Sequence, residues 1–195
     1  VRTNLASGQT LTLGAVVGGG SRTILIRAAG PALSAFGLAG HPDPRLDLFP
    51  AGAQSPSASN EDWPASLVPA FNSVGAFAFP GNSKDAALSQ SVNGAFTVRA
   101  GGPGAGIVLV EAYDTGGSAG GRLVNVSARN RVGTGDDILI AGFSVAGAGA
   151  KQVLIRAVGP TLSTFGVTGF LTDPTVRVLD ARGASVGVND NWSSA

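Results

Sequence analysis

A duplication inside the chain constrains its fold more than any other feature. Residues 23–37 read TILIRAAGPALSAFG and residues 152–166 read QVLIRAVGPTLSTFG, so ten of the fifteen positions are identical. Each copy runs 41 residues from its first position to a tryptophan, Trp63 in one and Trp192 in the other. A repeat at this offset of 129 residues indicates that both regions follow one structural plan.

The two copies have unequal surroundings. Residues 64–121 follow the first copy and contain several further strand patterns, whereas the sequence after Trp192 contains none of them. We therefore expect a complete repeat over residues 1–121 and a second, incomplete copy over residues 122–195. The boundary is expected near Gly116–Gly121, a Gly/Ser-rich stretch that few contacts should cross.

Strand patterns dominate the chain. Apolar residues alternate with period two or form short continuous runs in several places, namely 10–13, 23–26, 45–48, 77–79, 107–113, 138–145 and 175–178. Asn93-Gly94 separates two such patterns, 86–92 and 95–99, and predicts a tight hairpin. Short helical turns are expected only at Pro31–Phe36 and Pro160–Phe165. These patterns predict an all-β chain of tandem β-sandwich units, jelly-roll or immunoglobulin-like, with almost no helix.

The residues shared by the two copies are mostly apolar, which favours a role in the core. The expected core positions are Leu25, Ile26, Leu33 and Phe36, with their counterparts Leu154, Ile155, Leu162 and Phe165. If Phe165 is fully buried, its truncation to alanine should cost about 3–5 kcal/mol.

Composition excludes several classes of protein. Thirteen basic and twelve acidic residues give a net charge of +1, too balanced for a nucleic-acid-binding surface. No apolar run reaches the length of a membrane helix, so membrane insertion is not expected. The chain has no cysteine and 30 glycines. There is therefore no disulfide framework or thiolate chemistry, and we expect an exported protein, extracellular or on the cell surface.

Several strings together resemble a known repeat. They are LIRAVGPTLSTFGV, DPTVRVLD, NDNW, VGAFAF, DAAL, GIVLVEAYD and GRLVNVSAR. They are similar to a tandem repeat of large exported surface proteins of Verrucomicrobia-like environmental bacteria, and the resemblance covers essentially the whole chain. It implies extracellular β-sandwich repeats with no established chemistry.

No catalytic residue is expected, and the chain is not predicted to be an enzyme. His41 is the only histidine and lies between prolines and glycines, which predicts a surface loop. Ser-His-Asp catalysis is not expected, because the second copy has no histidine at the position of His41 and the sequence contains no G-x-S-x-G string. Glu111, Asp114 and Asp85 could form a carboxylate pair for glycoside hydrolysis, but carboxylates at strand ends usually face solvent.

The paired strings Asn60-Glu-Asp-Trp and Asn189-Asp-Asn-Trp are rich in side-chain oxygens. Asn60, Asp62, Asn189 and Asp190 are therefore weak candidates for Ca²⁺ ligands. The favoured alternative is an Asx turn that carries each tryptophan into the core. No other metal and no cofactor are expected.

Arg27 and Arg156 end the apolar strand of each copy. Either could be a buried arginine paired with a carboxylate such as Asp47, or a solvated strand end. Asn125 and Asn191 begin N-x-S/T sequons and are candidate glycosylation sites. The glycine-rich strings lack the Lys-Ser/Thr and helix of a phosphate loop and are expected in hairpin loops; they are Gly18–Gly20, Gly101–Gly104 and Gly116-Gly117.

Two functions remain open at this point. One is a structural repeat module or filament protomer whose partners are identical subunits. The other is a carbohydrate-binding or adhesive module in which Trp63, Trp192 and Tyr113 stack on sugars, which would require exposed rings. The incomplete second copy favours the first, because a sandwich without its later strands exposes apolar faces and open strand edges. The second sandwich could be completed in three ways. Residues 64–121 could serve both copies, the natural chain could continue, or a neighbouring chain could add a strand.

Overall fold

A computed structural model describes residues 1–117, 120–135, 137–145 and 148–192. Strands make up 41% of the chain and helices 12%, which confirms the all-β class. The chain divides into two compact units, Val1–Gly142 and Phe143–Ala195. No helix of the described ranges is both long and apolar enough to cross a membrane.

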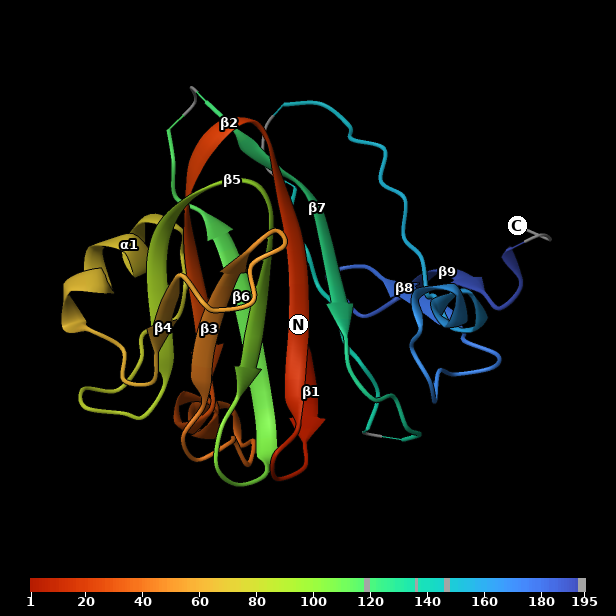
Figure 1. The fold of residues 1–195 in the computed structure, drawn as a ribbon, viewed down its shortest axis with the longest axis horizontal. Coiled ribbons are helices and arrows are strands. Elements are labelled where there is room, and N and C mark those ends of the chain that lie inside the picture. The colour runs from red at the N-terminus through yellow and green to blue at the C-terminus, as the bar shows by residue number, and fades with distance from the viewer. Residues whose placement is uncertain (118–119, 136, 146–147, 193–195) are drawn as a thin grey trace. The chain divides into compact units, whose positions relative to one another are not determined.

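The first unit is an antiparallel, sandwich-like arrangement of seven strands (Figure 1). In the sheet the order is β1-β6-β2-β5-β3-β4, and β7 pairs with the amino-terminal half of β2. The strands are β1 (Arg2–Leu5), β2 (Thr10–Ala29), β3 (Arg45–Pro50), β4 (Ala58–Asn60), β5 (Ala86–Gly101), β6 (Gly106–Asp114) and β7 (Arg122–Arg129). Its helical elements are η1 (Pro31–Phe36), η2 (Ala65–Leu67) and α1 (Val68–Ser73).

β2 is a long strand that pairs with β5 along most of its length and changes its other partner half-way. β2 lies between β5 and β7 over Thr12–Val17, and between β5 and β6 over Ile24–Ala28. The register shifts between Val17 and Arg22, where Gly19 and Gly20 have φ values of 83° and 118°. Glycine adopts such angles without the steric cost that a Cβ brings.

The expected hairpin at Asn93-Gly94 is wrong. β5 continues through both residues, and Gly94, with φ 72°, lies opposite the irregular part of β2. The expected hairpin loop at Gly18–Gly20 is likewise wrong, because these residues belong to β2. Gly18–Gly20 and Asn93-Gly94 therefore lie at an irregular position within two paired strands and do not form reverse turns.

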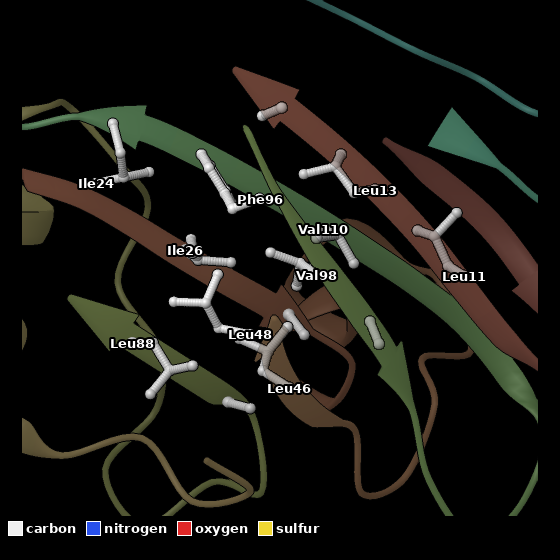
Figure 2. Close-up of a cluster of buried hydrophobic side chains, with 14 of the residues drawn as sticks. Leu11, Leu13, Ile24, Ile26, Leu46, Leu48, Leu88, Phe96, Val98 and Val110 are labelled. Atoms are coloured by element: carbon white, nitrogen blue, oxygen red, sulfur yellow. The ribbon is translucent and has the colours of Figure 1, made fainter. Parts of the chain in front are cut away.

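The main core lies between the inward faces of these strands. Alternate residues of both halves of β2 meet those of β3, β5 and β6 in one cluster (Figure 2). The labelled side chains are Leu11, Leu13, Ile24, Ile26, Leu46, Leu48, Leu88, Phe96, Val98 and Val110. Because strand side chains alternate between faces, Leu25, Arg27 and Ala29 point to the opposite side.

That opposite side is covered by short helical elements and a loop. Leu25 and Ala29 join a second buried cluster with Leu33 of η1, Phe71 of α1 and Phe79. The strand expected at residues 77–79 is therefore wrong, since these residues form a coil segment over the sheet. α1 was not predicted, because six residues are too few to show a helical period.

The second unit repeats the local geometry of the first copy. It contains η3 (Pro160–Phe165), β8 (Val176–Leu179) and β9 (Ser185–Asn189). In η1 and η3 alike, a glycine closes the turn in the left-handed region, Gly37 at φ 73° and Gly166 at φ 71°. The pair Val176↔Asn189 in β8–β9 corresponds to Leu46↔Asn60 in β3–β4. Both predicted helical turns and the strand at 175–178 are confirmed.

The non-local strands of the second copy do not form. Residues 152–158, equivalent to the second half of β2, are assigned to no strand, and the strand expected at 138–145 is reduced to one bridge between Ile140 and Arg2. Their counterparts in the first copy pair with β5 and β6.

The core predictions therefore differ between the copies. Leu25, Ile26 and Leu33 are buried as predicted. The predictions for Phe36, Leu154, Ile155 and Phe165 are wrong: these side chains are 59%, 85%, 39% and 77% exposed, and Leu162 is only partly buried. The second copy lacks the covering layer, and Phe36 meets Phe77 edge to face (centroids 5.1 Å apart) but is otherwise open.

The compact units do not divide where the repeats were expected to meet. β7 pairs with β2 over Thr12–Gly18, so many contacts cross the stretch 116–121. The division falls instead between Gly142 and Phe143. The repeat limits 1–121 and 122–195 are statements about sequence units, and they stay a prediction.

Candidate functional site

Arg27 occupies the most unusual environment of the first unit. Its side chain is fully buried, and the guanidinium carbon lies over three aromatic rings, 4.3 Å from the centroid of Phe71, 4.5 Å from Phe77 and 4.0 Å from Phe79. Arg27 Nε lies 3.4 Å from Glu111 Oε2. We call these four residues around Arg27 the arginine cage.

The cage explains how a charge is tolerated inside an apolar layer. Burial lowers the pKa of Arg27, while Glu111 opposes the shift by favouring the charged form. The guanidinium nitrogens have no hydrogen-bond partner among the described residues. Electrostatic attraction to the ring faces and to one carboxylate therefore takes the place of hydrogen bonds.

Glu111 is held from its other side by Tyr113. The Tyr113 hydroxyl donates a 2.7 Å hydrogen bond to Glu111 Oε1, and burial together with this bond raises the pKa of Tyr113. Asp47, the carboxylate suggested for Arg27, instead accepts hydrogen bonds from Arg45 and Ser59. Burial alone would raise the pKa of Asp47, but these bonds lower it.

The other two candidate carboxylates have separate structural partners. Asp114 pairs with Arg22. Asp85 is buried, and its Oδ1 accepts hydrogen bonds from the backbone N–H groups of Gly30 (2.7 Å) and Ala32 (3.2 Å) at the start of η1. Ser83 donates to Asp85 Oδ2 at 2.6 Å. Glu111, Asp114 and Asp85 are thus engaged with three different sets of groups.

The prediction that His41 lies in a surface loop is wrong. Its side chain is 1% exposed, and Nδ1 accepts a 3.3 Å hydrogen bond from the Asp43 backbone N–H. Burial lowers the pKa of His41, partly offset by the nearby Asp43 carboxylate. The cause is a close approach of two backbones: a Cβ on Gly30 would lie 2.1 Å from the His41 carbonyl oxygen. The His41 backbone N–H also donates a 2.7 Å hydrogen bond to the Ile107 carbonyl of β6, which holds the loop against the sheet.

Trp63 is half-buried beside the cage. Its ring stacks on Phe71 (centroids 5.6 Å apart) and meets Phe79 edge to face, while Nε1 donates to Ser83 Oγ at 3.2 Å. A shallow pocket of about 380 Å³ lies against this ring. Its lining residues are Asp62, Trp63, Ala65, Gly81, Asn82, Ser83 and Lys84.

The candidate Ca²⁺ ligands of the first copy serve the turn. Asn60 Nδ2 donates to the Asp62 carbonyl at 2.8 Å, and Asn60 Oδ1 accepts from the Ala87 backbone N–H at 2.9 Å. Asp62 pairs with Lys84. In the second copy, Asn189 Nδ2 donates to the Asn191 carbonyl at 3.2 Å, and Asp190 is exposed. Within the described ranges, no group of three or more acidic or histidine side chains has the geometry of a metal site.

The second copy keeps the turn but has no cage. Arg156, the counterpart of Arg27, is exposed, and Trp192, the counterpart of Trp63, is 91% exposed. Every cage residue of the first copy comes from residues 64–121. The structure therefore brings together three residues that the sequence analysis considered separately, Arg27, Glu111 and Tyr113, and leaves Arg156 exposed.

The two sequon asparagines are exposed. Asn125 is in β7 opposite Val16, and Asn191 follows β9 in the second unit. Their accessibility is compatible with glycosylation, which stays a prediction.

Comparisons with known proteins give no relative from which a function could be carried over. No protein-family model matches the chain, and no match is found among curated proteins or solved structures. The cage was missed from the sequence because Phe71, Phe77 and Phe79 are more than forty residues from Arg27. One signal was present: Arg27 alternates with Leu25 and Ala29, which places it on an apolar face.

Proposed function

We propose that this protein is a structural repeat module of an extracellular surface protein or filament, and that its subunits associate through the edges and faces of their β-sheets. One observation carries the proposal. Leu154 and Ile155 are 85% and 39% exposed, whereas the equivalent Leu25 and Ile26 are fully buried. Apolar strand residues without cover are typical of surfaces that bind another protein.

A contact between repeat copies inside the chain supports the same proposal. β7 begins the second sequence copy, yet it pairs with β2 of the first copy over seven residue pairs. The first strand of one repeat thus adds to the second strand of another. Val124 and Val126 of β7 are 55% and 52% exposed, so this added strand also carries uncovered apolar side chains.

Sedimentation velocity over a range of protein concentrations, with electron microscopy of the largest species, tests the proposal. The chain should form larger species as its concentration rises. Leu154→Asp should weaken this association by at least about tenfold, because a charge on an apolar contact must be desolvated. Ser55→Asp, in an exposed loop, adds the same charge elsewhere and should have no effect. A monomer at all concentrations, or equal behaviour of both variants, would contradict the proposal.

The pocket beside Trp63 favours carbohydrate binding as a second candidate function. Sugars stack on aromatic rings and hydrogen-bond to polar rims, and Asp62, Asn82 and Lys84 supply such a rim. Against it, Phe71 covers one face of the indole. A glycan array with the native chain and with Trp63→Ala tests this function: binding lost in the variant supports it, and no binding by the native chain rejects it.

A further inference from the structure

Residues 152–158 have a fully described template in the first copy. There the second half of β2 lies between two strands, so that Leu25 faces Ser89 of β5 on one edge and Tyr113 of β6 on the other. Arg27 likewise lies between Ala87 and Glu111. Both partner strands belong to residues 64–121.

The second copy is already shaped to receive the same partners. The turn that follows the strand repeats its hydrogen bonds: Leu33 N–H to the Gly30 carbonyl at 3.0 Å becomes Leu162 N–H to the Gly159 carbonyl at 2.9 Å. A Cβ on Gly159 would lie 2.0 Å from the Leu171 carbonyl oxygen, as one on Gly30 would from His41. The turn and the close backbone approach of the second copy are therefore formed. Within the described residues, the strand pairing and the cage are not.

Arg156 makes the missing partner chemically specific. In the first copy the same arginine is buried by three aromatic rings and one carboxylate. An ordinary apolar surface would leave the guanidinium without compensation for its lost hydration. A segment that buries Arg156 must therefore bring aromatic faces and an acidic group to this point.

A folded second copy of the chain cannot supply that segment from its own first unit. There β2 already occupies the edges of β5 and β6 that would pair with this strand, over Ala86–Val92 and Leu109–Asp114. Its aromatic residues already enclose Arg27. The partner must be a further segment of this type that is not yet paired.

We infer that residues 152–158 are an acceptor strand for an additional segment with the chemistry of residues 64–121, which pairs with both edges of the strand and encloses Arg156 in a second arginine cage. This inference rests on the repeat character in the proposed function and names the partner that the proposal leaves open. It makes Arg156 the residue that distinguishes such a segment from other strands.

The test uses the full chain, extended after Ala195 by a second copy of residues 64–121. Amide hydrogen exchange by mass spectrometry compares residues 153–158 in the parent and extended chains. We expect exchange in this segment to slow by on the order of 100-fold in the extended chain, because its amides gain strand partners. Equal exchange in the two chains would overturn the inference.

Two variants of the extended chain test the cage itself. Arg156→Ala, or Phe77→Ala with Phe79→Ala in the added segment only, should reverse at least about tenfold of that protection. Arg177→Ala, an exposed arginine on β8, is the matched control and should leave it unchanged. Amides of Leu25–Ala28 report that the first unit remains folded. Protection that persists in both cage variants would overturn the role of Arg156.

These results separate the inference from the proposed function. If the parent chain stays monomeric while residues 153–158 are protected in the extended chain, the proposed association between subunits is rejected and the acceptor-strand inference is supported. If the parent associates but the extension gives no protection, the acceptor strand fails and the association stands.

Discussion

At the scale of single residues, identical side chains have different fates in the two copies. Leu25 and Leu154 occupy the same place in the repeated string LIRA, yet one is fully buried and the other is 85% exposed. The sequence around each residue is nearly the same, so the difference comes from strands far away in the chain. Whether the leucine is buried therefore depends on the strands that pair with its segment and not on the local sequence.

Alanine substitutions at these two leucines should therefore give opposite results. Leu25→Ala removes packed methyl groups and should lower the free energy of unfolding by about 2–5 kcal/mol. Leu154→Ala should lower it by less than about 0.5 kcal/mol, as for other surface changes. Urea unfolding followed by circular dichroism measures both. Similar losses would mean that residues 152–158 are packed in solution.

His41 should make the stability of the protein depend on pH. Burial lowers its pKa in the folded chain, so the unfolded chain, with an ordinary value of 6.5, binds the proton more readily. The contribution of neutral His41 to the free energy of unfolding is therefore complete above pH 6.5. It is lost as the pH falls from 6.5 towards the lower pKa of the folded chain.

Thermal unfolding of the native chain and of His41→Gln at about pH 7.5 and 5.5 measures this effect. The midpoint of the native chain should fall more between the two pH values than that of the variant. His41 is the only histidine, and the terminal amine and the carboxylates titrate in both proteins. The same change in both would show that His41 titrates as it does in the unfolded chain.

At the scale of elements, the two helical turns could be predicted from local signals, whereas the pairing of the long strands could not. The helical turns at Pro31–Phe36 and Pro160–Phe165 were predicted because proline, spaced apolar residues and glycine act within six positions. The hairpin predicted at Asn93-Gly94 is wrong, because the conformation of these two residues depends on the irregular part of β2 opposite them. The arginine cage could not be derived either, because it joins Arg27 to aromatic residues of another segment.

Asp85 shows how a distant carboxylate fixes a short element. It accepts the first backbone N–H groups of η1, which no residue inside η1 satisfies. Asp85→Ala should lower the free energy of unfolding by about 1.5–3 kcal/mol, the range for hydrogen bonds to a charged group. Asp190→Ala, at an exposed position, is the control and should leave it unchanged. Chemical unfolding measures both, and an unaffected Asp85→Ala would show that solvent or another group satisfies η1.

At the scale of the whole molecule, the chain contains a covered and an uncovered version of the same sequence segment. Arg27 is enclosed within the first unit, and Arg156 is exposed in the second. Since a protease needs an extended and accessible backbone, the two arginines report directly on the state of each strand.

Trypsin at low concentration should cut after Lys151 and Arg156 well before it cuts after Arg27. Mass spectrometry of samples taken over time should show a persistent fragment that begins at Val1 and contains all of β1 to β6. Cleavage after Arg177 serves as a reference for an exposed site. If Arg156 resists as long as Arg27, residues 152–158 are covered by another chain in solution.

The pairing of β2 also determines when the first unit can fold on the ribosome. β2 ends at Ala29, but the strands that flank it lie between residues 86 and 129. At about 5–20 residues per second, roughly 5–20 seconds of synthesis separate the strand from its last partner. Until β5 has been synthesised, the apolar segment of β2 has none of its flanking strands to pair with. Chaperones that hold such segments are therefore expected to engage residues 10–29 before any part of the sheet exists.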